Sequence, residues 1–167
     1  LTHGHADHYG AAAALQEATG ATLAVGADDC ALVRMSKEPH FRPATLIGWL
    51  LVTLGLARPA PGQPPAAPDW CIGGEFSLAY LGVPGRVIPT PGHTAGSLSI
   101  ALDTGEVIIG DLLISFVRRQ RPGKPLFLED RDAWRESLRR VMALKPKLLH
   151  AGHGGPFEPE AVLRKFP

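Results

Sequence analysis

The sequence has few cysteines, no excess of either charge and no long apolar run, and each absence excludes a class of protein. Cys30 and Cys71 are too few for a disulfide framework and lack a metal-type spacing, so we expect two partly buried free thiols. A net charge of +1 offers no basic field to nucleic acid. No stretch of about eighteen apolar residues is present, so no membrane span is expected.

What is present is ordinary for one globular domain. The chain has 167 residues, of which 45% are hydrophobic and 20% charged. That length allows a sizeable core, and that composition is typical of globular proteins.

Metal-ligating residues are concentrated at the start, in LTHGHADHYG, which contains His3, His5, Asp7 and His8. Residues two apart on an extended segment point the same way, so His3 and His5 can share one ion. The chain must then turn, which leaves Asp7 and His8 to face a second ion. Imidazole and carboxylate groups together suit Zn²⁺ and similar ions. The alternative is an incidental histidine-rich surface turn.

Three further ligand-bearing turns weigh against that alternative. They are Thr90-Pro91-Gly92-His93-Thr94, Gly110-Asp111 and Gly152-His153-Gly154, and each follows a strand-like segment. Loops at strand ends commonly carry catalytic groups. With the HxHxDH motif at residues 3–8, these turns resemble the motifs of the metallo-β-lactamase superfamily, which includes glyoxalase II-like thioesterases and lactonases. The resemblance runs nearly from end to end of the chain.

The resemblance implies a fold and a ligand set. The fold would be α/β, a four-layer αβ/βα sandwich formed by one domain over residues 1–167. Several strands precede the HxHxDH motif in the family, so the domain would be incomplete at its N-terminus. By the family pattern, the first metal takes His3, His5 and His93, the second takes Asp7, His8 and His153, and Asp111 bridges both.

The resemblance also implies a chemistry. A hydroxide that bridges two metals would attack a carbonyl ester, thioester or lactone, and Asp7 would be the catalytic residue that orients it and carries a proton. We expect two Zn²⁺ ions per chain, with iron or manganese as alternatives. The partner would be a small-molecule substrate in the cytoplasm, with no nucleic acid; the oligomeric state is open and includes a homodimer.

Three other functions stay open. A mononuclear-iron persulfide dioxygenase-like oxidoreductase and a two-metal phosphodiesterase both occur among relatives of this kind. A metal-binding domain without turnover is the third. β-Lactam cleavage ranks below thioester or lactone cleavage, because resistance enzymes are a small part of the family.

Local patterns predict the helices and strands. Helices are expected at residues 8–19, about 27–35, 130–144 and 159–166. Strands are expected at residues 21–25, 75–80, 86–89, 97–102, 106–109 and 147–150, with a tight turn at Asp103-Thr104-Gly105. His150 is expected to pack within its strand, and Thr94 to cap the following segment or to support the metal site.

Residues 37–69 interrupt this pattern and are expected to form a variable insertion. Prolines bracket the apolar run ATLIGWLLVTLGLA at residues 44–57. The run is shorter than the roughly 20 residues that span a bilayer. We expect a helix packed on the core; a lid or substrate wall is the second interpretation. Contact with a membrane surface ranks third, because the run lacks a basic face. His40 is expected in a solvated loop.

Overall fold

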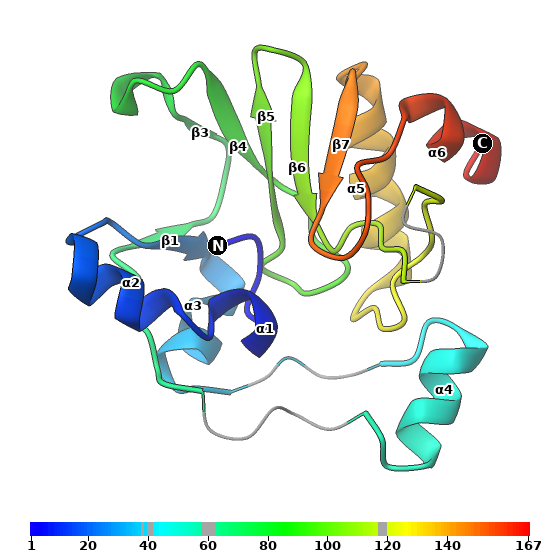
Figure 1. Ribbon diagram of the computed structural model, residues 1–167, viewed down its shortest axis with the longest axis horizontal. Coiled ribbons are helices and arrows are strands. Elements are labelled where there is room, and N and C mark those ends of the chain that lie inside the picture. Colours follow the sequence, from blue (N-terminus) through cyan, green and yellow to red (C-terminus); the bar gives the residue numbers. More distant parts are fainter. Residues whose placement is uncertain (38, 40–41, 58–62, 117–119) are drawn as a thin grey trace.

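The chain folds into two β-sheets with helices on their outer faces (Figure 1). A computed structural model describes residues 1–37, 39, 42–57, 63–116 and 120–167. His40 lies outside the described residues. The helices are α1 (Ala6–Tyr9), α2 (Ala12–Thr19), α3 (Ala27–Arg34), α4 (Leu46–Thr53), α5 (Arg131–Ala143) and α6 (Pro159–Lys165). The strands are β1 (Ala24–Gly26), β2 (Trp70–Ile72), β3 (Phe76–Ser77), β4 (Gly85–Pro89), β5 (Leu98–Leu102), β6 (Glu106–Gly110) and β7 (Leu148–Ala151).

The larger sheet has the strand order β3-β4-β5-β6-β7. Strands β3 to β6 pair antiparallel, and β7 pairs parallel with β6. The expected tight turn at Asp103–Gly105 joins β5 to β6, and Gly105 there has a φ of +95°, which favours glycine. Because antiparallel pairing alternates direction, β4, β6 and β7 run the same way, and their carboxyl ends meet at one edge.

Three apolar clusters hold four layers together. Trp134, Leu138 and Val141 of α5 pack on the larger sheet, and Asp130 caps this helix by accepting the N–H groups of Asp132 and Ala133. A second cluster joins the two sheets, with Ile72 of the β1–β2 pair against residues of β4 and β5. The third packs α1, α2 and α3 on β1. This αβ/βα order confirms the expected fold class.

Several expected elements are displaced or missed. The helix expected at residues 8–19 is two helices, α1 and α2, separated at Gly10. Strand β2 was not expected, and it pairs parallel with β1. The strand expected at residues 75–80 is only two residues long, because the chain leaves the sheet for a 3₁₀ turn at Ala79–Leu81. Short strands whose partners lie far along the chain leave little periodic pattern in the sequence.

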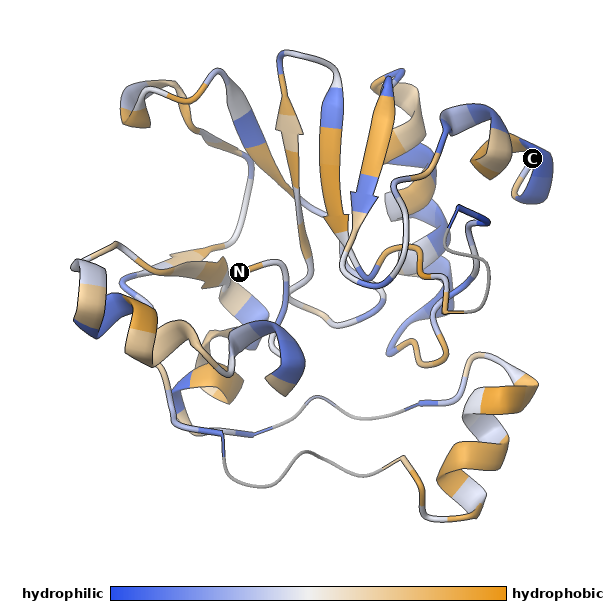
Figure 2. Ribbon diagram, viewed as in Figure 1, coloured by the Kyte–Doolittle hydropathy of each residue, from blue (hydrophilic) through white to orange (hydrophobic). Residues whose placement is uncertain are grey.

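Helix α4 is not packed into the core, which corrects the leading expectation for residues 44–57. Thr45 caps it by accepting the N–H of Gly48. Leu46 is 80% exposed and Trp49 is 55% exposed. Figure 2 shows α4 as an apolar helix at the margin of the molecule. Among the described residues, no helix is long and apolar enough to cross a membrane.

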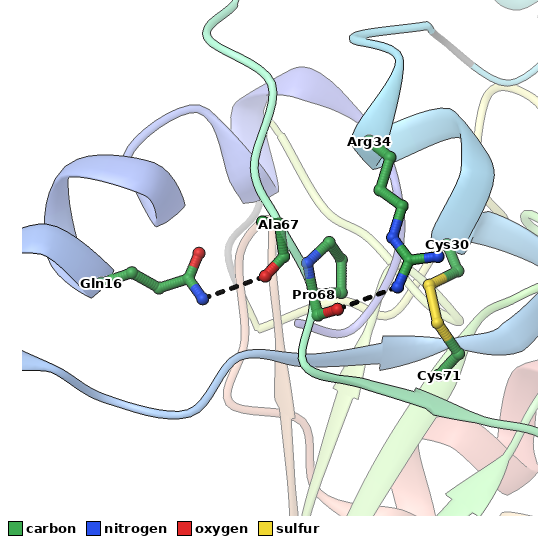
Figure 3. Close-up of a disulfide and its surroundings, with 6 residues drawn as sticks. All are labelled: Gln16, Cys30, Arg34, Ala67, Pro68 and Cys71. Carbon is green, nitrogen blue, oxygen red and sulfur yellow. Dashed lines mark hydrogen bonds between the residues drawn. A yellow bond between two sulfur atoms is a disulfide. The ribbon is translucent and has the colours of Figure 1, made fainter.

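The two cysteines form a disulfide, so the expectation of free thiols is wrong (Figure 3). Cys30 lies in α3, and Cys71 lies in β2 opposite Val25 of β1. Because α3 follows β1 directly and packs back over the β1–β2 pair, the two residues meet across a sequence separation of 41. A count of cysteines cannot reveal that contact. Arg34 also donates a hydrogen bond to the Pro68 carbonyl beside it.

Candidate metal centre

The site forms where loops from both halves of the fold meet. His93, Asp111 and His153 follow β4, β6 and β7, the three strands whose carboxyl ends share an edge. The segment that carries His3 and His5 is held across this edge, because the Leu98 N–H donates to the Thr2 carbonyl at 2.7 Å. Helix α1 then begins at once, which turns the chain after His5.

The structure brings all seven sequence-predicted ligands together. Among the described residues, three groups have potential ligand atoms within 4.8 Å of one another. They are His3, His5 and His93; Asp7, His8 and His153; and His3, His8 and Asp111. The first two are the two sets of three that the family pattern predicts.

Asp111 lies between those two sets. One carboxylate oxygen is 3.5 Å from His8 Nε2. The other is 3.7 Å from His93 Nε2 and 3.5 Å from His153 Nε2. The second oxygen thus lies near a member of each set, which is the placement that a shared ligand requires.

Hydrogen bonds from outside the site fix how the imidazole rings face it. His93 Nδ1 lies 3.0 Å from the Phe127 carbonyl, so it donates there and leaves Nε2 as the acceptor facing the centre. The Thr2 hydroxyl lies 3.2 Å from His3 Nδ1, again at the nitrogen that faces away. Outer contacts of this kind hold metal-ligating histidines in one orientation.

Burial keeps the histidines of the first set neutral. Burial and the neighbouring histidines hold the pKa of His3 well below its usual value. The same causes lower the pKa of His5 to about 3, and burial lowers that of His93 to about 4. Neutral imidazole is the form that binds a metal ion.

The pKa values of the two carboxylates, Asp111 and Asp7, are shifted in opposite directions. Burial raises the pKa of Asp111 to about 7. A hydrogen bond from His153 lowers the pKa of Asp7 to about 2, and the same contact raises the pKa of His153. Asp7 is 57% exposed on its side chain and His153 is 33% exposed, so this pair forms the solvent-facing side of the site.

Buried polar atoms in the centre fit divalent cations. Among the described residues, His3 Nε2, His8 Nε2 and Asp111 Oδ1 are buried without a hydrogen-bond partner. Buried nitrogen and oxygen atoms are normally satisfied, and these three residues form one of the groups whose potential ligand atoms lie within 4.8 Å of one another, so a cation between them would fit. The imidazole and carboxylate donor set suits zinc, iron or manganese.

Two glycines allow the ligand loops to approach this closely. Gly92 has a φ of +133°, and a Cβ there would lie 2.4 Å from the Trp134 backbone nitrogen. A Cβ on Gly152 would lie 2.5 Å from both Asp111 Oδ1 and His8 Cε1. Any larger residue would push the loops of His93 or His153 out of place.

Asp29 is a supporting residue that the sequence analysis missed. Its carboxylate is 1% exposed and joins the two loops of the first metal set. Oδ2 accepts hydrogen bonds from the Gly4 N–H and the Thr94 hydroxyl, both at 2.7 Å, and Oδ1 accepts one from the Gly96 N–H at 2.9 Å. Nothing in the sequence distinguishes Asp29 from its exposed neighbour Asp28.

Thr94 lies beside the site, and His150 lies outside it. Thr94 supports the site through Asp29, and its N–H also donates to the Ser97 hydroxyl. His150 stays outside the centre, as expected, but it is not tightly packed, because its side chain is 39% exposed beside Glu106.

A family model described as the metallo-beta-lactamase superfamily matches residues 1–153, which include all seven candidate ligands. The chain therefore belongs to the metallo-β-lactamase superfamily. Among curated proteins, the "Probable metallo-hydrolase YflN" of Bacillus subtilis (strain 168) is 28% identical over 169 residues, which cover 93% of this chain. The chain spans only 63% of that protein's length.

Solved structures agree with this membership. The structure of TTHA1623 in a di-iron-bound form has a TM-score of 0.66 and 27% identity, and the match covers all of this chain and 74% of that chain. The BLEG-1 B3 metallo-beta-lactamase has a TM-score of 0.67 at 22% identity, with coverage of 100% and 74%. At that identity the second likeness shows the fold alone.

Proposed function

We propose that this chain carries the catalytic centre of a metal-dependent hydrolase that cleaves a carbonyl ester, thioester or lactone. The observation that carries this proposal is the position of Asp111 between two sets of three ligands. One set alone would suit a single ion. Two sets that share a carboxylate would suit a pair of ions, as in two-metal hydrolases.

The residues have distinct roles in this proposal. His3, His5 and His93 would hold one ion, and Asp7, His8 and His153 the other, with Asp111 shared. When bound, the ions would supply an activated water molecule and polarise the substrate carbonyl. Asp7 would orient the attacking water and carry its proton to the leaving group; its lowered pKa and its exposed side chain support this role.

Zinc is the metal that we propose first, because the donors are mostly imidazole nitrogens. Iron is the alternative, and the di-iron form of TTHA1623 supports it. A persulfide dioxygenase-like oxidoreductase would need one iron and would leave the second set of ligands unused. A phosphodiesterase has weaker support, since the net charge of +1 offers a nucleic acid little attraction.

Metal analysis combined with a substrate panel tests the proposal. The metal-loaded protein should contain about two ions per chain and hydrolyse members of a panel of thioesters, lactones, β-lactams and phosphodiesters. Asp111→Ala should lower metal content and hydrolysis together, whereas the matched change His150→Ala, outside the centre, should lower neither. Full hydrolysis with both ions retained in Asp111→Ala would refute the bridging role. One iron per chain with sulfur-dependent oxygen uptake would favour the oxidoreductase.

The cytoplasmic location stays a prediction. The Cys30–Cys71 disulfide weighs against it, because disulfides persist mainly in oxidising compartments.

A further inference from the structure

Helix α4 and its flanks form an exposed apolar surface that the proposed chemistry does not use. Seven of its large side chains are 38–80% exposed: Leu46, Ile47, Trp49, Leu50, Val52, Leu54 and Leu56. No charged residue occurs between Pro43 and Ala57. Concentrated apolar exposure of this kind usually marks a binding surface. A surface without charge favours an apolar ligand over a charged one.

This apolar surface is anchored to the segment that orients a metal-site histidine. The Ala44 N–H donates to the Leu126 carbonyl at 2.8 Å, and the Leu128 N–H donates to the Arg42 carbonyl at 2.9 Å. Between them, the Phe127 carbonyl accepts from His93. Gly48 presses against the same segment, since a Cβ there would lie 2.3 Å from the Leu126 carbonyl oxygen. In Figure 1, α4 lies on the side of the molecule where β6 and β7 end.

A second apolar group stands at the solvent-facing side of the site. The Phe116 ring lies 5.5 Å from the His153 ring, and Phe116 is 60% exposed. A substrate must enter on this side, because Asp7 and His153 are the exposed members of the centre. A carbonyl that reacts at the centre would therefore lie near the apolar side chain of Phe116. Helix α4 is attached to the same region through residues 126–128, which contact His93.

We infer that the substrate is a carbonyl compound with a medium or long aliphatic acyl chain, which lies against α4. This inference rests on the proposed function and names its substrate class. A membrane surface fits less well, because an interfacial helix needs a polar face and α4 has none. A second copy of the chain could also cover α4, and the experiment below separates it.

Binding of the product acids tests the inference without relying on turnover. The probes are butyrate and octanoate, titrated into the metal-loaded protein while the tryptophan emission, to which Trp49 contributes, is followed. A methylene that loses half of its contact with water is worth about 2-fold in affinity, so octanoate should bind about 15-fold more tightly than butyrate. The emission should shift to the blue, and Trp49→Phe should remove the shift.

A matched pair of variants locates the chain-binding surface. Leu46→Gln should reduce the octanoate preference to a few-fold. Leu163→Gln makes the same change at a leucine that is 52% exposed on α6, and it should retain the preference. Equal affinity for the two acids would overturn the inference. So would a Leu46→Gln variant that turns a dimer into a monomer and keeps the octanoate preference, because α4 would then be a contact between copies.

Hydrolysis of an ester series from acetyl to decanoyl separates this inference from the proposed function. A steady rise of kcat/KM with chain length supports both. Turnover that is indifferent to chain length overturns the acyl-chain inference alone. If no ester in the series is cleaved by the metal-loaded protein, the hydrolase proposal fails and the inference fails with it.

Discussion

Asp29→Asn should weaken the fold and the first metal set together, because this one carboxylate ties both of its loops. Asp29 accepts a hydrogen bond from the N–H of Gly4, which lies between His3 and His5. It accepts another from the hydroxyl of Thr94, which follows His93. An asparagine has the same shape but only one acceptor oxygen. If that oxygen keeps the Gly4 and Thr94 contacts, the amide NH₂ must face the Gly96 N–H.

The expected cost follows from those contacts. One buried N–H would lose its partner, which costs about 1–3 kcal/mol, and two hydrogen bonds to a charged acceptor would become weaker neutral ones. Removing a buried charge returns part of this loss. We therefore expect the free energy of unfolding to fall by about 2–4 kcal/mol. Because the loops of His3, His5 and His93 would loosen, metal affinity should fall by about 10- to 100-fold.

Asp28→Asn is the matched control. It makes the same change one residue earlier in the first turn of α3, where the side chain is exposed, so it should cost about 0.5 kcal/mol or less through the helix dipole. Urea unfolding of the metal-free proteins would give the stabilities, and cobalt titration followed by visible absorption would report the ligand geometry. If the two variants unfold alike and give the same cobalt spectrum, the loops are positioned by something other than Asp29.

Two further predictions concern acid and reduction. The metal-free protein should lose stability as the pH falls from 6.5 to about 4. In this range the unfolded chain binds protons on His5 and His93, whereas the folded chain leaves both neutral, because their pKa values are about 3 and about 4. Asp111 opposes one of these two protons, because its pKa of about 7 keeps it protonated only in the folded chain. These three groups alone give a slope of about 1.4 kcal/mol per pH unit, and His3, whose pKa is also held well below its usual value, makes the slope steeper. Urea midpoints that stay constant over that range would contradict this prediction. The disulfide closes a loop of 41 residues, which limits the unfolded chain and stabilises the fold by about 4 kcal/mol. The double variant Cys30→Ser, Cys71→Ser should therefore lower the free energy of unfolding by roughly 2–4 kcal/mol. An unchanged urea midpoint would mean that the bond does not constrain the unfolded chain.

The seven candidate ligands could be picked out from the sequence because their signals are local. HxHxDH, Thr-Pro-Gly-His-Thr and Gly-His-Gly are short motifs in which Gly92 and Gly152 are required by close approach. The strands before His93, Asp111 and His153 are visible from their composition. Helix α5 was predicted for the same reason, since its buried face repeats within one element.

What the sequence could not predict depends on contacts between distant segments. The Cys30–Cys71 bond requires α3 to pack over β2, and β2 itself is three residues long with a partner far along the chain. Asp29 looks like any acid at the start of a helix until Gly4 and Thr94 meet it. The apolar run of α4 predicted burial, because hydrophobic content alone does not distinguish a core helix from a helix that awaits a ligand.

Metal binding and folding should be coupled in this protein, because the ligands come from both halves of the sandwich. His3, His5, Asp7 and His8 belong to the loop and helix beside β1, whereas His93, Asp111 and His153 follow strands of the larger sheet. Without a cation, buried imidazoles face one another with atoms such as His3 Nε2 unsatisfied. An ion bound there satisfies these atoms and ties the two halves together, so its binding free energy adds to the stability of the fold. Asp29 connects the same two halves through hydrogen bonds, which explains why a residue that touches no ion should still affect metal affinity.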